Sequence, residues 1–214
     1  MKTIKAWHFV SDDRKLGYGD GRKVRKGITH KVKVEPILCQ QGLHASIRAI
    51  DAIQYAPGNV VSRIIIGGEI IKGDDKIVGT ERTYLWVADA EDTLREFARW
   101  CALEVIGLWD APDIVVEYLR TGDESIRVAA WDARDAWDAR AAWAARAAWA
   151  AARAAWAAAG AARTARAARA AGDARAAWDA GDARDARAAW AARAAFMEKA
   201  NRKLTNMLNK LKPK

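Results

Sequence analysis

The sequence predicts a small α+β domain followed by an all-helical, alanine-rich triplet-repeat region. Two changes along the chain indicate this division. Residues 129–196 hold 38 alanines in 68 positions and 7 of the 11 tryptophans. The formal charge changes from −1 over 1–124 (18 Lys+Arg, 19 Asp+Glu) to +10 over 125–214 (18 Lys+Arg, 8 Asp+Glu). We therefore expect a domain at 1–124, a repeat region at 125–196 and a basic amphipathic helix at 197–214.

Strand-like and helix-like patterns follow one another in the first 124 residues, separated by Gly and Pro turns. Alternating or β-branched segments predict strands at Ile4–Val10, Ile28–Val34, Val60–Ile71 and Lys76–Val87, with a bulge at Gly67-Gly68. Helix signals predict a helix capped by Ser46 and ending near Tyr55, an amphipathic helix from about Asp89, and a short helix opened by Pro112. No strand–helix–strand unit repeats, so we expect an α+β fold rather than a doubly wound sheet.

Cysteine content and hydropathy bear on the compartment. Cys39 and Cys101 are too few for a disulfide framework and lack the spacing of metal ligands, so we expect two buried free thiols and no metal site. The start, MKTIKAWHFV, lacks the long apolar stretch of a signal peptide, and charges interrupt every long apolar run. The sequence thus predicts a cytoplasmic protein without a membrane span.

From Ala129 the chain follows a period of three, with Ala in the middle of each triplet and Trp, Arg, Gly or Phe at its end. Trp and Arg interleave at the third positions, which favours cation–π contacts worth about 0.5–1 kcal/mol each. These side chains are the expected interaction residues: Trp131, Arg134, Trp137, Arg140, Trp143, Arg146, Trp149, Arg153, Trp156, Trp178 and Trp190.

Composition and period favour different conformations for the repeat. Ala and Arg are strong α-helix formers, whereas a period of three matches the 3₁₀-helix, in which triplets stack into flat faces. We expect an α-helix, with a long 3₁₀-helix as the alternative. A hinge at Gly160 would give a hairpin with arms at 129–159 and 161–196, and breaks at Gly172 and Gly181 as well would instead give several short helices.

The last 18 residues predict a basic amphipathic helix that caps the repeat. Its apolar residues are Phe196, Met197, Leu204, Met207, Leu208 and Leu211, and its cations are Lys199, Arg202, Lys203, Lys210, Lys212 and Lys214. The positive charge also suits contact with nucleic acid or with a membrane surface.

Several motifs in the first 120 residues carry a resemblance. They are Ala6-Trp7-His8-Phe9, the stretch from Leu38 to Ser46 (LCQQGLHAS), Tyr55-Ala56-Pro57-Gly58, Gly68-Glu69-Ile70 and Asp75-Lys76-Ile77-Val78. Together they resemble an uncharacterised domain family of bacteriophages and bacteria, over roughly residues 5–120. The resemblance implies a phage-associated protein and no particular activity, and some members of that family carry similar Ala/Trp/Arg-rich tails.

More distantly, the layout of His8, His44 and Ser46 resembles the ADP-ribosyltransferase fold. The resemblance implies that His8 orients the ribose of NAD, that His44 stacks near the nicotinamide and that Ser46 begins the next helix. Some transferases of this kind use a late glutamate, for which Glu69 and Glu81 are candidates. Two other interpretations stay open: the histidines have only structural roles, or His30 joins His8 and His44 in a metal site.

Three functions therefore follow as expectations. The first is an interaction or assembly protein whose repeat binds a second copy or another protein. The alternatives are an ADP-ribosyltransferase-like enzyme that uses His8, His44 and Ser46, and a nucleic-acid-binding protein that uses the basic Trp/Arg tail. No cofactor is expected, except NAD if the enzyme interpretation holds.

Overall fold

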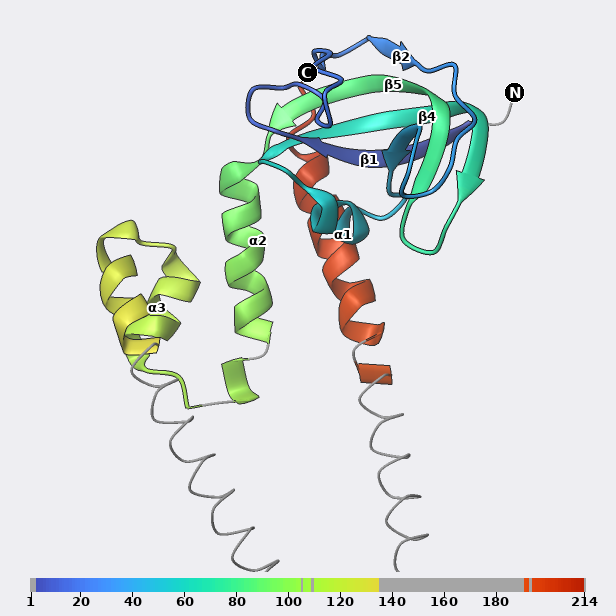
Figure 1. Cartoon of the computed structure of the whole chain (residues 1–214). Coiled ribbons are helices and arrows are strands. Elements are labelled where there is room, and N and C mark those ends of the chain that lie inside the picture. The colour runs from blue at the N-terminus through green and yellow to red at the C-terminus, as the bar shows by residue number, and fades with distance from the viewer. Residues whose placement is uncertain (1–2, 105, 109, 135–190, 193, 214) are drawn as a thin grey trace, which may run out of the picture. The chain divides into compact units, whose positions relative to one another are not determined.

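A computed structural model describes residues 3–104, 106–108, 110–134, 191–192 and 194–213 (Figure 1). The described chain forms a five-stranded antiparallel sheet and several short helices. The strands are β1 (Ile4–Val10), β2 (Thr29–Lys31), β3 (Leu43–Ala45), β4 (Val60–Lys72) and β5 (Ile77–Asp89). The α-helices are α1 (Ala49–Ala52), α2 (Glu91–Glu104) and α3 (Asp113–Thr121), and short 3₁₀ turns lie at Ile53–Tyr55, Ile106–Leu108 and Glu124–Ile126.

A long hairpin of β4 and β5 forms the centre of the sheet. Its order is β1-β4-β5-β2, and β3 pairs with the other end of β5, where Leu43 lies opposite Gly79. The β-branched run of β4 (VVSRIIIGGEIIK) suits a strand with one buried face. The predicted bulge is confirmed: the pairing shifts between Gly67 and Ile70, and Gly68 has φ +72°, which favours glycine.

The chain divides into two compact units. The first, called the sheet unit below, comprises Met1–Ala98 together with Phe196–Lys214, and the second is Arg99–Ala195. Residues 196–214 thus belong with the sheet and not with the segment that precedes them. The expected boundary at residue 124/125 stays a prediction, because most of the chain after it lies outside the described residues.

The helix at 194–209 provides part of the core of the sheet unit. Ala200, Leu204, Met207 and Leu208 are buried at the i, i+4, i+7, i+8 spacing of one helix face. The backbone N–H of Ile50 donates to Oδ1 of Asn201 at 3.3 Å. Figure 1 shows this helix beside α1. The predicted amphipathic helix therefore exists, and its apolar side is covered by the sheet unit.

Arg48 forms polar contacts between α1 and the helix at 194–209. Its guanidinium lies 2.9 Å from the carboxylate of Glu198 and donates to the carbonyl oxygen of Met197 at 3.5 Å. It also lies 3.7 Å from Asp51. Burial raises the pKa of Asp51 and the charge of Arg48 opposes that rise. Arg48 thus links α1 to the helix that arrives from the far end of the chain.

The predicted fold class, an α+β domain followed by an all-helical repeat region, is wrong for this chain. The described residues give an antiparallel sheet with short helices, and the helix at 194–209 returns to the sheet. The prediction grouped the C-terminal helix with the repeat, whereas Leu204 and Leu208 of that helix are buried in the sheet unit. Repeat positions 135–190, with the predicted hinge at Gly160, lie outside the described residues.

Two local predictions in the first part are also wrong. Ser46 is not a helix cap: it forms an isolated bridge with Trp7, and α1 starts only at Ala49 after Arg48. Cys39 is exposed rather than buried, and Cys101 is partly exposed. For Ser46 the pairing with Trp7 of β1 overrides the local preference for a cap, and Cys39 lies in a tight turn that Ile37 and Gln41 close.

Candidate functional site

A polar cluster lies on one face of the sheet, among otherwise apolar side chains. Its members are Arg82 and Tyr84 of β5, His8 of β1 and His30 of β2, and we call it the Arg82 cluster. His30 lies directly opposite Arg82 in the β2–β5 pairing. Tyr84 lies opposite Ile64, which in turn lies opposite Ala6, two residues from His8. Since alternate residues of a strand share a face, all four side chains meet on one side.

Tyr84 stands at the centre of this cluster. The ring of His30 meets it edge-on at 5.3 Å between centroids, and the ring of His8 does so at 6.2 Å. The guanidinium of Arg82 lies 5.4 Å from the centroid of the same ring. Tyr84 is fully buried within the core that Ala6, Val10, Ile64 and Ile66 form. The cluster therefore lies in the core of the sheet unit, and apolar side chains surround it.

Burial governs the charge of this cluster. It lowers the pKa of His8 well below the ordinary value, and the charge of Arg82 lowers it further. The pKa of His30 is lowered by burial and then by Arg22 and Arg82. Burial raises the pKa of Tyr84, which Arg82 opposes. At neutral pH the two imidazoles and the phenol are uncharged, so the cluster carries the single positive charge of Arg82.

His44 lies next to the cluster but has contacts of its own. Its Nε2 accepts a hydrogen bond from the backbone N–H of Cys39 at 3.0 Å, and its carbonyl oxygen accepts one from Nη1 of Arg82 at 2.7 Å. Burial lowers its pKa. Ser46 is buried and exchanges two backbone hydrogen bonds with Trp7, at 2.7 and 3.0 Å. The catalytic roles of His8, His44 and Ser46 stay predictions, and the structure gives His44 and Ser46 backbone contacts that hold β3 in place.

Arg82 and Tyr84 are not among the site residues that the sequence predicts. Their signal is a charged residue in the middle of a strand, two positions before a tyrosine on the same face. For His30 the sequence predicts a role only in the metal-site interpretation. Among the described residues, no group of three or more His, Cys, Asp or Glu side chains is arranged to hold a metal ion.

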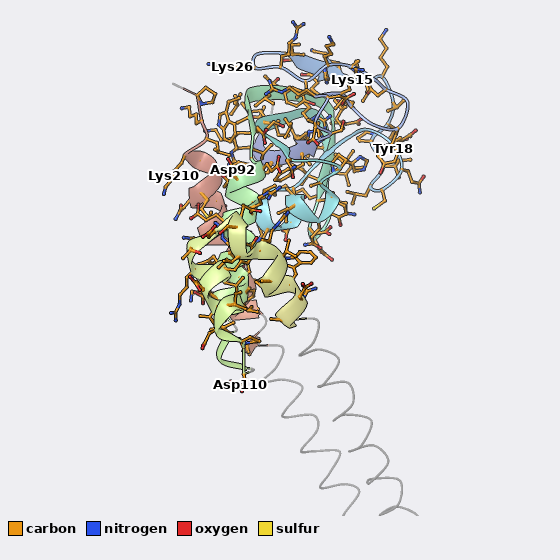
Figure 2. All side chains as sticks on the ribbon, turned by 90° about the vertical axis from the view of Figure 1, so that its left-hand side faces the viewer. Lys15, Tyr18, Lys26, Asp92, Asp110 and Lys210 are labelled. Carbon is orange, nitrogen blue, oxygen red and sulfur yellow. The ribbon has the colours of Figure 1, made fainter. Side chains whose placement is uncertain are left out.

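The loop between β1 and β2 carries a basic surface next to this face. Tyr18 is fully exposed at its tip and has φ +56°, between Gly17 and Gly19. Figure 2 shows Lys15, Tyr18 and Lys26 at the outer edge of the molecule, pointing away from the sheet. The guanidinium of Arg22, also in this loop, donates two hydrogen bonds of 2.6 Å to the carboxylate of Asp20. Asp20 is therefore already paired.

The described part of the repeat contains one Trp/Arg pair. Residues 127–134 are helical, and Trp131 is 53% exposed. The guanidinium of Arg134 lies 4.8 Å from the centroid of the Trp131 ring, which is the expected cation–π contact at a spacing of three. The other predicted interaction residues, from Trp137 to Trp190, lie outside the described residues.

Comparisons with family models, with curated proteins and with solved structures found no match to this chain. The resemblances to the bacteriophage domain family and to the ADP-ribosyltransferases therefore stay predictions. In the described part of the chain no helix is long and apolar enough to cross a membrane.

Proposed function

We propose that the chain is an interaction protein that associates with a second copy of itself through its Trp/Arg repeat. The observation that carries the proposal is Trp131, the first tryptophan of the repeat. More than half of its surface is exposed although it is a large apolar side chain, and Val128, one turn earlier, is 67% exposed. Aromatic rings with a guanidinium on one face are typical of protein interfaces.

The way the repeat is attached supports this proposal. The sheet unit contains both the residues before Arg99 and those after Ala195, so the segment between them is fastened at both ends. Leu204 and Leu208 are fully buried in that unit, and Arg48 pairs with Glu198. A segment held at both ends loses less conformational entropy on binding than one with a free end. The sheet unit therefore serves to hold the repeat for contact.

The composition of the repeat favours a second copy as the partner. Residues 129–196 contain 7 Trp, 11 Arg and 7 Asp. Each arginine on one copy can meet an indole face or a carboxylate on the other, so the surface is complementary to itself. The seven aspartates argue against a surface dedicated to phosphate groups.

Sedimentation velocity of the full chain tests this function. We expect the average mass to rise with protein concentration above that of the monomer. Replacing Trp131, Trp137 and Trp143 together by Ala should return the chain to a monomer. Tyr18→Ser removes an exposed aromatic side chain outside the repeat and should leave the association unchanged. A wild-type chain that stays monomeric at every concentration would overturn the proposal.

The same full-length protein also tests the alternative that the repeat binds nucleic acid. Single-stranded DNA is added at low salt and its retardation is followed in a gel. Retardation by a monomeric wild-type chain, lost in the triple Trp variant and at higher salt, would assign the repeat to nucleic acid instead. Retardation that persists in the triple variant would place the DNA contact outside these tryptophans.

A further inference from the structure

Arg82 is a buried cation without an anionic partner. Its side chain belongs to a residue that is 3% exposed, and Nη1 donates to the carbonyl oxygen of His44. Its Nε is buried and has no hydrogen-bond partner. Among the described residues no carboxylate forms an ion pair with it: Asp20 is held by Arg22, and Glu81 is held by Lys31 at 2.7 Å. A guanidinium removed from water without a counter-charge is costly, so a missing partner is expected.

Three neighbours of Arg82 have the same deficit. Nδ1 of His8 and Nδ1 of His30 are buried without a hydrogen-bond partner, and the buried hydroxyl of Tyr84 has no partner outside the cluster, where it faces the guanidinium of Arg82. Together with Nε of Arg82 they make up four of the six such side-chain atoms in the described part of the chain. Buried polar atoms in folded proteins nearly always have partners, and a group of them around one ring indicates a polar occupant.

The chemistry of these four groups selects the charge of that occupant. A guanidinium N–H only donates, and a phenol and a neutral imidazole can each donate one hydrogen bond. The fixed charge among them is positive, so it repels a metal ion and attracts an anion. A set of donors that includes a guanidinium suits an oxyanion with several oxygens, such as phosphate, better than a carboxylate with two.

We propose that the Arg82 cluster, formed by Arg82, His8, His30 and Tyr84, binds a phosphate-type oxyanion in the core of the sheet unit. The guanidinium of Arg82 provides the charge. The phenol of Tyr84 and the imidazole of His8 donate further hydrogen bonds, and His30, which bonds the backbone of Lys23, packs against the ring of Tyr84. This site is independent of the proposed self-association, because none of its residues belongs to the repeat.

Thermal unfolding and calorimetry of the full chain with sodium phosphate test the site. Sodium chloride at matched ionic strength is the reference. We expect the unfolding midpoint to rise with the logarithm of phosphate concentration, by roughly 5–10 °C at a hundredfold excess over the dissociation constant. An unchanged midpoint together with no heat of binding overturns the proposal.

Two variants test whether phosphate binds at the Arg82 cluster. Arg82→Gln should abolish phosphate binding, and unchanged affinity would overturn the proposal. Lys26→Gln removes an exposed charge of the nearby loop as a matched control and should bind like wild type. If Lys26→Gln instead weakens binding as much as Arg82→Gln does, the anion lies on the loop and the proposed site is wrong.

A second variant decides the question if Arg82→Gln does not fold. Tyr84→Phe keeps the ring and its packing and removes only the hydroxyl. We expect phosphate affinity about tenfold weaker, because one hydrogen bond to a charged ligand is lost. Affinity equal to wild type would contradict the site.

A third arm identifies the source of the phosphate group. Adenosine 5′-monophosphate replaces inorganic phosphate in the same calorimetric titration. Tighter binding of the nucleotide supports a phosphate group carried by a larger molecule, and tighter binding of inorganic phosphate supports the free ion. Both results require the Arg82 cluster, so each must disappear in Arg82→Gln.

Discussion

The sheet unit and the Trp/Arg repeat use the same residue type in opposite ways. In the sheet unit Trp7 and Trp86 are buried and meet edge-on at 5.7 Å between ring centroids, with Arg63 4.5 Å from the ring of Trp7. In the repeat Trp131 is exposed and its ring lies against Arg134. The same pairing of indole and guanidinium thus supports a core in one region and offers a surface in the other. Burial, and not the pair itself, therefore decides what a tryptophan contributes to stability.

Replacing Trp86 by Ala should produce the largest change in this comparison. The side chain is 4% exposed, and its loss leaves a cavity beside Trp7. We expect the free energy of unfolding to fall by about 3–5 kcal/mol. Urea unfolding of the full chain followed by near-UV circular dichroism measures it. A loss below about 1 kcal/mol would remove the contrast between the two regions.

Leu204→Ala tests whether the helix at 194–209 belongs to the sheet unit. Leu204 is fully buried on the face that this unit covers. We expect a loss of about 3 kcal/mol in the same urea experiment. Asn206→Ala, at an exposed position of the same helix, serves as the control and should change stability by less than about 0.5 kcal/mol. Equal effects at the two positions would mean that the helix is not part of the core.

The pH dependence of the unfolding free energy tests whether the histidines of the Arg82 cluster have lowered pKa values in the folded protein. The pKa of His8 in the folded protein lies below its unfolded value of about 6.5, because the imidazole is buried beside Arg82. The unfolded chain therefore binds the proton first as the pH falls, and stability is lost below about pH 6.5. Each such histidine contributes at most about 1.4 kcal/mol per pH unit.

His8→Gln should make this slope smaller. Unfolding free energies are measured in chloride buffer between about pH 7.5 and about pH 5, where histidine titrates. Phosphate is left out because it is the proposed ligand of the cluster. The remaining slope reflects His30 and His44, whose pKa values are also lowered by burial. A slope identical to that of wild type would show that His8 ionises equally well in the folded and unfolded chain.

Trp131→Ala should have the smallest effect on stability. Its ring is more than half exposed, and the contact with Arg134 contributes about 0.5–1 kcal/mol. We expect an unfolding free energy within about 1 kcal/mol of wild type, measured under the conditions used for Trp86→Ala. A loss as large as that of Trp86→Ala would show that Trp131 is a core residue, and the surface role proposed for the repeat would fail.

The long strands could be predicted from the sequence because their pattern is local. β1 has the predicted bounds, Ile4–Val10, and β4 and β5 begin and end within two residues of the prediction. β3 could not be found, since its three residues form a strand only through pairing with Val78 and its neighbours. Ser46 has the chemistry of a helix cap, but its hydrogen bonds to Trp7 override that local preference.

The candidate site was only partly predictable for the same reason. His8 and His44 stood out by residue type, whereas Arg82 and Tyr84 look like ordinary members of a solvated strand. Their surroundings include β2, which pairs with β5 from 50 or more positions earlier in the chain, as in the pairing of His30 with Arg82. Sequence patterns report which side of a strand is polar, and not whether a polar side chain will be covered.

The return of the helix at 194–209 to the sheet unit has a consequence for synthesis of the protein. On the ribosome, residue 98 emerges before the 97 residues of Arg99–Ala195, and the helix follows only afterwards. At about 5–20 residues per second, the nascent sheet unit waits roughly 5–20 s for Leu204 and Leu208. Until then the apolar surface that these two leucines cover has no partner from this helix. The sheet unit can therefore take up this helix only after the whole repeat has been translated.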